Sequence, residues 1–154
     1  MKINKMKYTL VVICVLFAGI KISFGQTFNT DAILGMWLTG TGKAAVTIYK
    51  DGNKYFGKIT WLKNPLDEGK PRIDKNNPDE KKKTDPLMGA NILKEFIFAG
   101  GDKWEKGTIY DPENGKTYSC KITMVNESKL DVRGFVGISM LGRTQVWIRI
   151  PDKK

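Results

Sequence analysis

The residues best suited to chemistry are carboxylates, and they gather in two short stretches. "YDPENGK" (110–116) sets Asp111 two residues before Glu113, and "DKNNPDE" (74–80) begins with Asp74. Two carboxylates on either side of a cleft are the groups that hydrolyse glycosidic bonds, one of them as an acid. A carboxylate-based hydrolase acting on an envelope or glycan substrate is therefore one hypothesis for this chain.

The same residues also have the chemistry of a tight turn. Proline presets φ after Asp111, and Asn114-Gly115 tolerates the left-handed backbone that hairpin turns require. Turn formation explains most of "DPENGK", so we expect a hairpin turn in which Asp111 accepts local backbone N–H bonds. Tyr110 should pack at the end of the strand, and any site here should take its other wall from residues 63–90.

The chain contains no histidine, which excludes Ser-His-Asp and Cys-His catalysis and histidine metal ligands. Cys120 is the one cysteine after residue 25, and its alternating surroundings predict a buried thiol. No phosphate loop, dinucleotide fingerprint or nucleophile elbow occurs. We therefore expect no metal and no cofactor, and the balance is against an enzyme.

The N-terminus has the layout of a secretory signal peptide. Lysines precede a 13-residue apolar run, and Ser23 and Gly25 fit a cleavage site before Gln26. We expect residues 1–25 to be removed and the protein to be exported to the periplasm or the exterior of a bacterium, with no stable membrane anchor afterwards. The remaining residues, 26–154, should form a single domain. Loss of the four lysines in the signal lowers the net charge from +10 to +6. The remaining cations are dispersed, so we expect no nucleic-acid partner.

Beyond the signal the dominant hydrophobic period is two, which indicates antiparallel strands with unlike faces. Gly-, Asn- and Asp-rich turns separate the apolar segments. An up-and-down meander of about eight strands closes most economically into a barrel, because closure removes the sheet edges. The expected strands are 33–39, 44–50, 54–62, 91–98, 104–110, 116–125, 128–136 and 143–150. The segment 91–98 also fits a short helix.

Two motifs resemble the lipocalin and fatty-acid-binding-protein superfamily. Gly35-x-Trp37 opens the first strand, and Arg143 and Arg149 lie on the last. In that superfamily a basic side chain of the final strand covers such a tryptophan at the closed end of the barrel. The resemblance implies that Trp37 is buried there with an arginine, first of all Arg149, over its ring.

A longer resemblance covers most of the chain after the signal. "GMWLT", "YKDGNKYFGKITWLK", "NNPD", "KWEKGTIYDPENGKTYSCKI", "LDVRGFVG" and "GRTQVWIRI" are similar to the bacterial domain-of-unknown-function family 2147. This resemblance implies a small exported protein of unassigned activity. It carries over no functional residue.

The last strand has two unlike faces, and its orientation decides what the barrel interior could bind. Thr144, Val146, Ile148 and Ile150 form one face, and the other is formed by Arg143, Gln145, Trp147 and Arg149. We expect the aliphatic face to point inward over most of the strand, since it costs less to bury. The opposite orientation would line the interior with guanidinium and indole groups able to hold a carboxylate and an apolar tail. The candidate ligand-binding residues are Trp37, Trp61, Tyr110, Arg133, Arg143, Gln145, Trp147 and Arg149.

The proline- and charge-rich segment 63–90 is too long for a simple connection and predicts a lid or a mobile cover. Its carboxylates depart from the spacing of a calcium loop. The favoured function is therefore the binding of a small amphipathic or acidic ligand by a monomer or weak dimer. A structural or interaction protein of the cell envelope is a third hypothesis.

Overall fold

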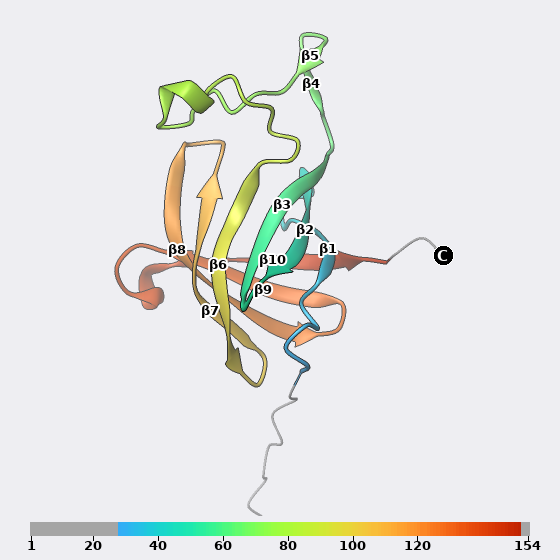
Figure 1. The fold of residues 1–154 in the computed structure, drawn as a ribbon, viewed down its shortest axis with the longest axis vertical. Helices are drawn as coiled ribbons and strands as arrows, with labels where there is room; N and C mark the ends of the chain where they lie inside the picture. The colour runs from blue at the N-terminus through green and yellow to red at the C-terminus, as the bar shows by residue number, and fades with distance from the viewer. Residues whose placement is uncertain (1–27, 152–154) are drawn as a thin grey trace, which may run out of the picture.

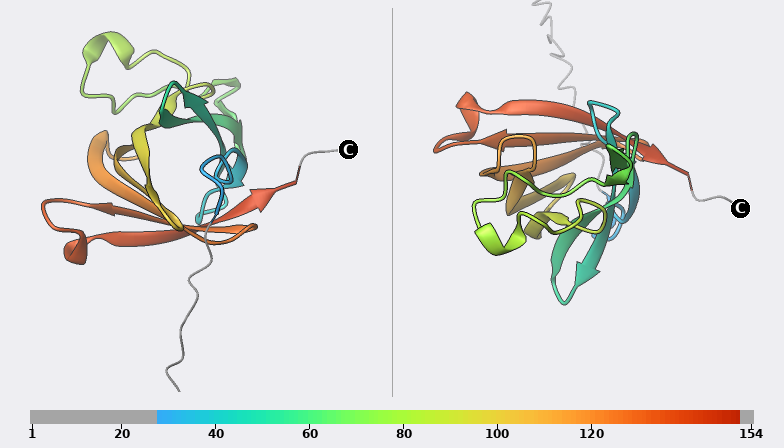
Figure 2. Two further views of the ribbon diagram at one scale, coloured as in Figure 1. Left: turned by 60° about the horizontal axis from the view of Figure 1, so that its bottom comes forward. Right: turned by 90° about the horizontal axis from the view of Figure 1, so that it is seen from above.

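The computed structural model describes residues 28–151, so the expected signal peptide and the cleavage before Gln26 lie outside the described residues. Eight antiparallel strands form a closed barrel in the order β1-β10-β9-β8-β7-β6-β3-β2 (Figures 1 and 2). These strands are β1 (Gly35–Leu38), β2 (Ala44–Asp51), β3 (Lys54–Leu62), β6 (Asn91–Gly100), β7 (Lys103–Asp111), β8 (Lys116–Asn126), β9 (Lys129–Phe135) and β10 (Arg143–Ile150). The predicted all-β, lipocalin-like barrel is confirmed.

Outside the barrel, two short strands and two single turns of 3₁₀ helix complete the described elements: β4 (Leu66–Asp67), β5 (Lys70–Pro71), η1 (Glu80–Lys82) and η2 (Ser139–Leu141). The segment 91–98 is a strand, because β6 is paired on both sides, with β3 and β7. In the described part of the chain no helix has the length and apolarity to cross a membrane.

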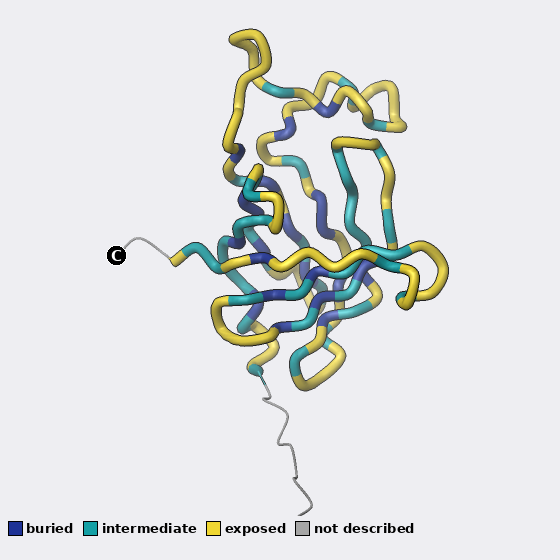
Figure 3. The backbone as a smooth tube through the Cα atoms, turned by 180° about the vertical axis from the view of Figure 1, so that it is seen from behind, coloured by how far each residue is buried: buried dark blue, intermediate teal, exposed yellow. Residues whose placement is uncertain are grey.

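The period-two pattern of the sequence becomes the inner and outer faces of the barrel wall. In β8, Cys120, Ile122 and Met124 are each 1% exposed, while the residues between them are partly accessible to solvent. Burial raises the pKa of the Cys120 thiol to about 12, so this side chain is apolar packing and not a nucleophile. The buried interior appears in dark blue in Figure 3.

A cation–π contact closes the barrel where its first and last strands meet. The Arg149 guanidinium carbon lies 4.1 Å from the centroid of the Trp37 ring, and Trp37 is fully buried. The Trp37 indole donates a 2.9 Å hydrogen bond to the carbonyl of Ile33. Arg149 donates to the carbonyls of Ala32 and Leu34 at 2.5 and 2.7 Å. The prediction for Trp37 and Arg149 is confirmed, and the same contacts hold the residues before β1 across this end.

Large side chains fill the interior, and two glycines make room for them. A Cβ at Gly107 would stand 2.4 Å from the Phe96 ring, and one at Gly57 would stand 2.8 Å from Leu93 Cδ1. The gap that remains beside Phe96 and Leu93 holds no water-sized space. This part of the barrel is a packed core, as expected when the inner positions of an eight-stranded barrel carry large residues.

The expectation for the last strand is wrong, because Trp147 and Arg149 of its mixed face point inward, while Arg143–Val146 are exposed on both faces. Trp147 is 1% exposed, whereas Val146 and Ile148 are 43% and 45% exposed. Pairing of Trp37 with Arg149 fixes this register, and a shift by one residue would exchange the two faces of β10. The contact between Arg149 and Trp37 therefore outweighs the lower cost of burying aliphatic residues.

A second difference concerns Trp61, which strict alternation in "YFGKITWL" (55–62) would put on one face with Tyr55 and Ile59. Val46 pairs with Ile59 and Ala45 with Trp61, so a β-bulge sets two residues of β3 opposite one of β2. The extra residue breaks the alternation. Trp61 is consequently 43% exposed, while Tyr55 and Ile59 are buried.

The two tryptophans provide a matched test of barrel closure. We expect Trp37→Ala to lower the free energy of unfolding by about 3–5 kcal/mol, because it removes a fully buried ring and its contact with Arg149. Trp61→Ala should cost clearly less, since its ring is partly exposed already. Urea unfolding followed by circular dichroism measures both, and equal losses would contradict this account of closure.

Candidate functional site

The segment between β3 and β6 folds into an ordered arm and returns to the barrel. After the β4–β5 hairpin it runs across one end of the barrel, above the tips of β7 and β8 (Figures 1 and 2). Backbone hydrogen bonds join its two halves, from Asp74 N to Asp85 O at 2.9 Å and from Leu87 N to Arg72 O at 2.9 Å. Leu87 is 8% exposed and belongs to the hydrophobic core. We call residues 72–90 the arm.

Asp74 attaches the arm to the barrel wall. Its side chain is the one buried charged group of residues 28–151, at 4% exposure. Tyr110, on β7, donates a 2.8 Å hydrogen bond to Asp74 Oδ1, and Asn77 donates a 2.7 Å bond to Oδ2. Both carboxylate oxygens are thus occupied, as a buried carboxylate requires.

The "YDPENGK" stretch forms the predicted hairpin turn, and the arm binds to this turn through hydrogen bonds. Asp111 Oδ1 accepts the backbone N–H of Glu113 at 2.9 Å, and Gly115 has φ of +70°. The Asn76 amide donates 3.0 Å bonds to the carbonyls of Pro112 and Glu113. A Cβ on Gly115 would stand only 2.0 Å from the Asn76 carbonyl oxygen. The polar side chains of this turn therefore stabilise its backbone conformation. The arm lies beside the turn, where residues 63–90 were expected.

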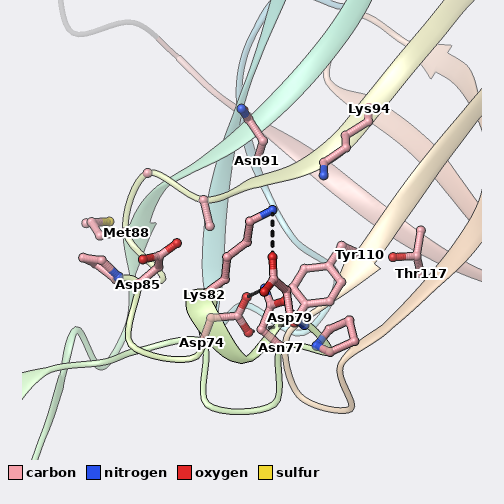
Figure 4. A pocket seen from close by; sticks show the side chains of 14 residues that line it. Asp74, Asn77, Asp79, Lys82, Asp85, Met88, Asn91, Lys94, Tyr110 and Thr117 are labelled. Carbon is pink, nitrogen blue, oxygen red and sulfur yellow. Dashed lines mark hydrogen bonds and ion pairs between the residues drawn. The ribbon is translucent and has the colours of Figure 1, made fainter.

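Between the arm and the barrel lies a cleft of about 560 Å³. Its barrel side consists of Asn91 and Lys94 of β6, Tyr110 of β7 and Thr117 of β8, which lie near the ends of these strands that the arm crosses. Figure 4 shows these side chains and those of the arm around one space. The lining is formed by Asp74, Asn77, Pro78, Asp79, Lys82, Asp85, Pro86, Met88, Gly89, Ala90, Asn91, Lys94, Tyr110 and Thr117. We call this space the lateral cleft.

The lateral cleft carries charges of both signs, from Lys82 and Lys94 and from Asp74, Asp79 and Asp85. Lys82, on η1, and Lys94, on β6, both direct their side chains into the space between arm and barrel (Figure 4). Lys82 lies 3.7 Å from Asp79 Oδ2 as an exposed ion pair, which contributes little to stability. The side chain of Lys94 forms no hydrogen bond or ion pair with any residue of the described chain. Its charge is thus available to a ligand.

Most of the carboxylates and the phenol beside the cleft are held in hydrogen bonds and ion pairs within the protein. Burial, and then the hydrogen bond to Asp74, raises the pKa of Tyr110 far above its usual range, so the phenol stays a hydrogen-bond donor. Asp74 is committed to Tyr110 and Asn77, and Glu113 pairs with Lys43 at 2.7 Å. The carboxylates named in the hydrolase hypothesis thus hold the arm and the turn.

Carboxylates of the arm do not converge on a cation site. Among residues 28–151 there is no group of three or more His, Cys, Asp or Glu side chains placed to hold a metal ion. The side chain of Asp79 instead accepts the N–H of Lys81 at 3.1 Å as the cap of η1.

The structure separates the eight candidate ligand-binding residues of the sequence. Tyr110 lines the lateral cleft, whereas Trp37, Trp147 and Arg149 belong to the packed interior or its closure. Trp61 lies on the outer surface. Arg133 binds the connection between β9 and β10, and Arg143 and Gln145 are exposed on β10. A binding role for any of these residues stays a prediction.

Sequence reasoning missed the barrel side of the cleft. Asn91, Lys94 and Thr117 lie on the polar faces of β6 and β8, where polar residues are expected on any solvated strand. Nothing in their spacing links them to Lys82, because the fold of the arm brings them together. The one available signal was the length and composition of residues 63–90.

The chain belongs to the family described as uncharacterized proteins conserved in bacteria (DUF2147), whose pattern matches residues 35–149. Among solved structures it is similar to protein HP1028 of Helicobacter pylori, described as belonging to the lipocalin family. The TM-score is 0.68 and the identity 22%, over 78% of this chain and 84% of that one. At this identity the likeness concerns the fold. No curated protein matches the chain.

Gly115 and Gly52 provide a matched test of the contact between the arm and the turn. Both have positive φ, but only Gly115 has an atom of another segment where a Cβ would stand. Gly52→Ala should cost about 1–2 kcal/mol from backbone strain alone. Gly115→Ala should cost more and should also speed trypsin cleavage after Lys81, Lys82 and Lys83, because Asn76 must move away and the backbone of the arm loses its support.

Urea unfolding and limited proteolysis measure the two effects separately. If Gly115→Ala matches Gly52→Ala in stability and leaves cleavage at the arm unchanged, the arm is not positioned by this turn.

Proposed function

We propose that this DUF2147 protein is a small-ligand-binding protein whose site is the lateral cleft, and that its ligand carries an anionic group and an apolar portion. The observation that carries the proposal is the uncommitted ammonium group of Lys94, directed into a space of about 560 Å³. A volume of this size is typical of small-molecule sites. Lys94 would pair with the anionic group, with Lys82 as a second cation nearby.

Other residues of the lining fit the rest of such a ligand. Met88 is 45% exposed and, with Pro78 and Pro86, offers apolar surface on the arm. Thioether side chains adapt to ligands of irregular shape. Asn91 and Thr117 add neutral hydrogen-bonding groups on the barrel side. Most of the lining is polar or charged, and its apolar surface is confined to the arm. A ligand held by charge and hydrogen bonds on the barrel side, with a short apolar portion against the arm, fits this division.

The packed interior supports this location over the barrel centre. Three fully or nearly fully buried tryptophans and Phe96 occupy the positions where a ligand of a hollow barrel would lie. A ligand there would have to displace well-packed side chains at a large cost. The lateral cleft requires no such rearrangement.

Octanoate is a suitable probe, because it combines a carboxylate with a short apolar tail. We expect it to shift backbone amide signals of Asn91, Lys94, Tyr110 and Thr117 in a ¹H–¹⁵N titration. Lys94→Gln should weaken the affinity by roughly tenfold, since it removes a charged hydrogen bond. Lys103→Gln, an exposed lysine of β7 outside the cleft lining, is the matched control and should leave the affinity unchanged.

Three results would overturn the assignment. They are an absence of shifts at tens of millimolar octanoate, shifts centred on Gln145 and other residues of β10, and equal affinities of the Lys94 and Lys103 variants.

We also propose that the protein acts outside the cytoplasm of a bacterium, on the basis of the apolar run and the small residues before Gln26. The intact mass of protein recovered from outside the cytoplasm should correspond to a chain beginning at Gln26. A mass that includes Met1, or a lipid attached to Cys14, would contradict this proposal.

A further inference from the structure

The connection between β9 and β10 presents a group of large apolar side chains to solvent. Val136, Ile138, Met140 and Leu141 are 72%, 62%, 84% and 78% exposed, which makes them the most exposed large hydrophobic residues of the described chain. The connection projects sideways from the barrel (Figure 1), and Figure 3 shows it as an exposed bend. We call residues 136–142 the apolar tip. Clusters of this kind on a protein surface mark contact sites more often than isolated apolar residues do.

Arg133 gives the apolar tip a defined conformation. Its guanidinium donates to the carbonyls of Ser139 at 2.7 Å and Met140 at 3.0 Å, and to Thr144 Oγ1 at 2.8 Å. Gly142 N–H also bonds to Ser139 O at 3.2 Å. Polar backbone groups of the tip are thereby paired within the protein, while its side chains point away. This removes much of the cost that a loop incurs when its backbone leaves water.

The surroundings of the apolar tip are cationic. Arg143 directly follows it, and Lys121 Nζ lies 3.4 Å from Ser139 Oγ. From 132 to 151 the sequence contains three arginines and no acidic residue. Apolar residues flanked by cations are the combination that binds at the surface of an anionic bilayer.

The size of the tip favours a lipid surface over a protein partner. A stable protein interface takes about 800 Å² and 20–30 residues from each side, with aromatic residues at its centre. The tip has four exposed aliphatic or thioether side chains and no aromatic one. A bilayer requires only that a few apolar side chains enter its interfacial zone, and each one that is fully buried raises the partition coefficient by roughly tenfold.

We propose that the apolar tip is a peripheral membrane-binding element that inserts into the surface of an anionic phospholipid bilayer. Val136, Ile138, Met140 and Leu141 enter the interfacial zone, and Arg143 and Lys121 lie at the level of the lipid phosphates. Arg133 holds the tip in shape and is a positioning residue. This proposal is independent of the lateral cleft, which is formed by other elements.

Vesicle co-sedimentation tests the proposal with phosphatidylglycerol–phosphatidylcholine vesicles and with phosphatidylcholine vesicles. We expect binding to the anionic vesicles that weakens with salt. Met140→Asp/Leu141→Asp should reduce it at least tenfold, and Arg143→Gln about fivefold. Val125→Asp is the control, an apolar residue of β8 that is 44% exposed and outside the tip, and it should have little effect. All proteins compared begin at Gln26, so the apolar run before that residue does not contribute to binding.

A local probe reports directly on insertion. On the chain that begins at Gln26, whose one cysteine is Cys120, an environment-sensitive fluorophore on Met140→Cys should shift to the blue with anionic vesicles, whereas the same label on Asn53→Cys in the β2–β3 turn should not. Cys120 is buried and does not compete for the label. Unchanged unfolding midpoints will show that the variants are folded.

The proposal is overturned if the Met140/Leu141 variant binds vesicles as the parent protein does, or if the two labels respond equally. It is also overturned if sedimentation velocity shows a dimer that the same double substitution dissociates, since the tip would then bind a second copy of the chain.

Discussion

The contact between Arg149 and Trp37 is the constraint on which the barrel depends. An eight-stranded barrel closes only if its first and last strands pair, and β1 has just four residues with which to do so. The Arg149 guanidinium adds further contacts to this short strand pairing. It covers the Trp37 ring and donates hydrogen bonds to the carbonyls of Ala32, Leu34 and Glu127. A cation in such a position is stable only when its N–H groups have acceptors, and the main chain supplies them.

Closure at this end fixes the character of the interior. The residues before β1 are held across the barrel, with Ile33 fully buried, and the inner face of β10 brings Trp147 into the core. Gly107 then admits the Phe96 ring, and the centre is filled with side chains. The interior of this barrel is therefore a packed core, whereas a barrel-shaped ligand carrier has a hollow interior.

Because the centre is packed, the lateral cleft that we propose as the ligand site is formed by a segment added to the barrel. The arm crosses one end of the barrel above the tips of β7 and β8 (Figure 1), and its position depends on Asp74, Asn76 and the turn after β7. The "YDPENGK" turn therefore has a role beyond reversing the chain, since it anchors the arm that forms the lateral cleft. The apolar tip, at the far end of the β9–β10 pair, is a separate surface of different chemistry.

The sequence by itself determined the features that depend on neighbouring residues. Period-two alternation, with Gly, Asn and Pro at the turns, predicts the eight strands and the hairpin at Asp111, because pleating and turn geometry are local properties. The lack of histidine excludes histidine-dependent catalysis in the same direct way.

Only the tertiary structure decided which face of β10 points inward. Both faces alternate equally well in the sequence, and the choice depends on the contact between Arg149 and Trp37, which are more than a hundred positions apart. Trp61 reaches the surface through a bulge that depends on the partner strand. The lateral cleft likewise joins Lys82 to Lys94 and Tyr110 through long-range folding of the arm, and no local pattern encodes that proximity.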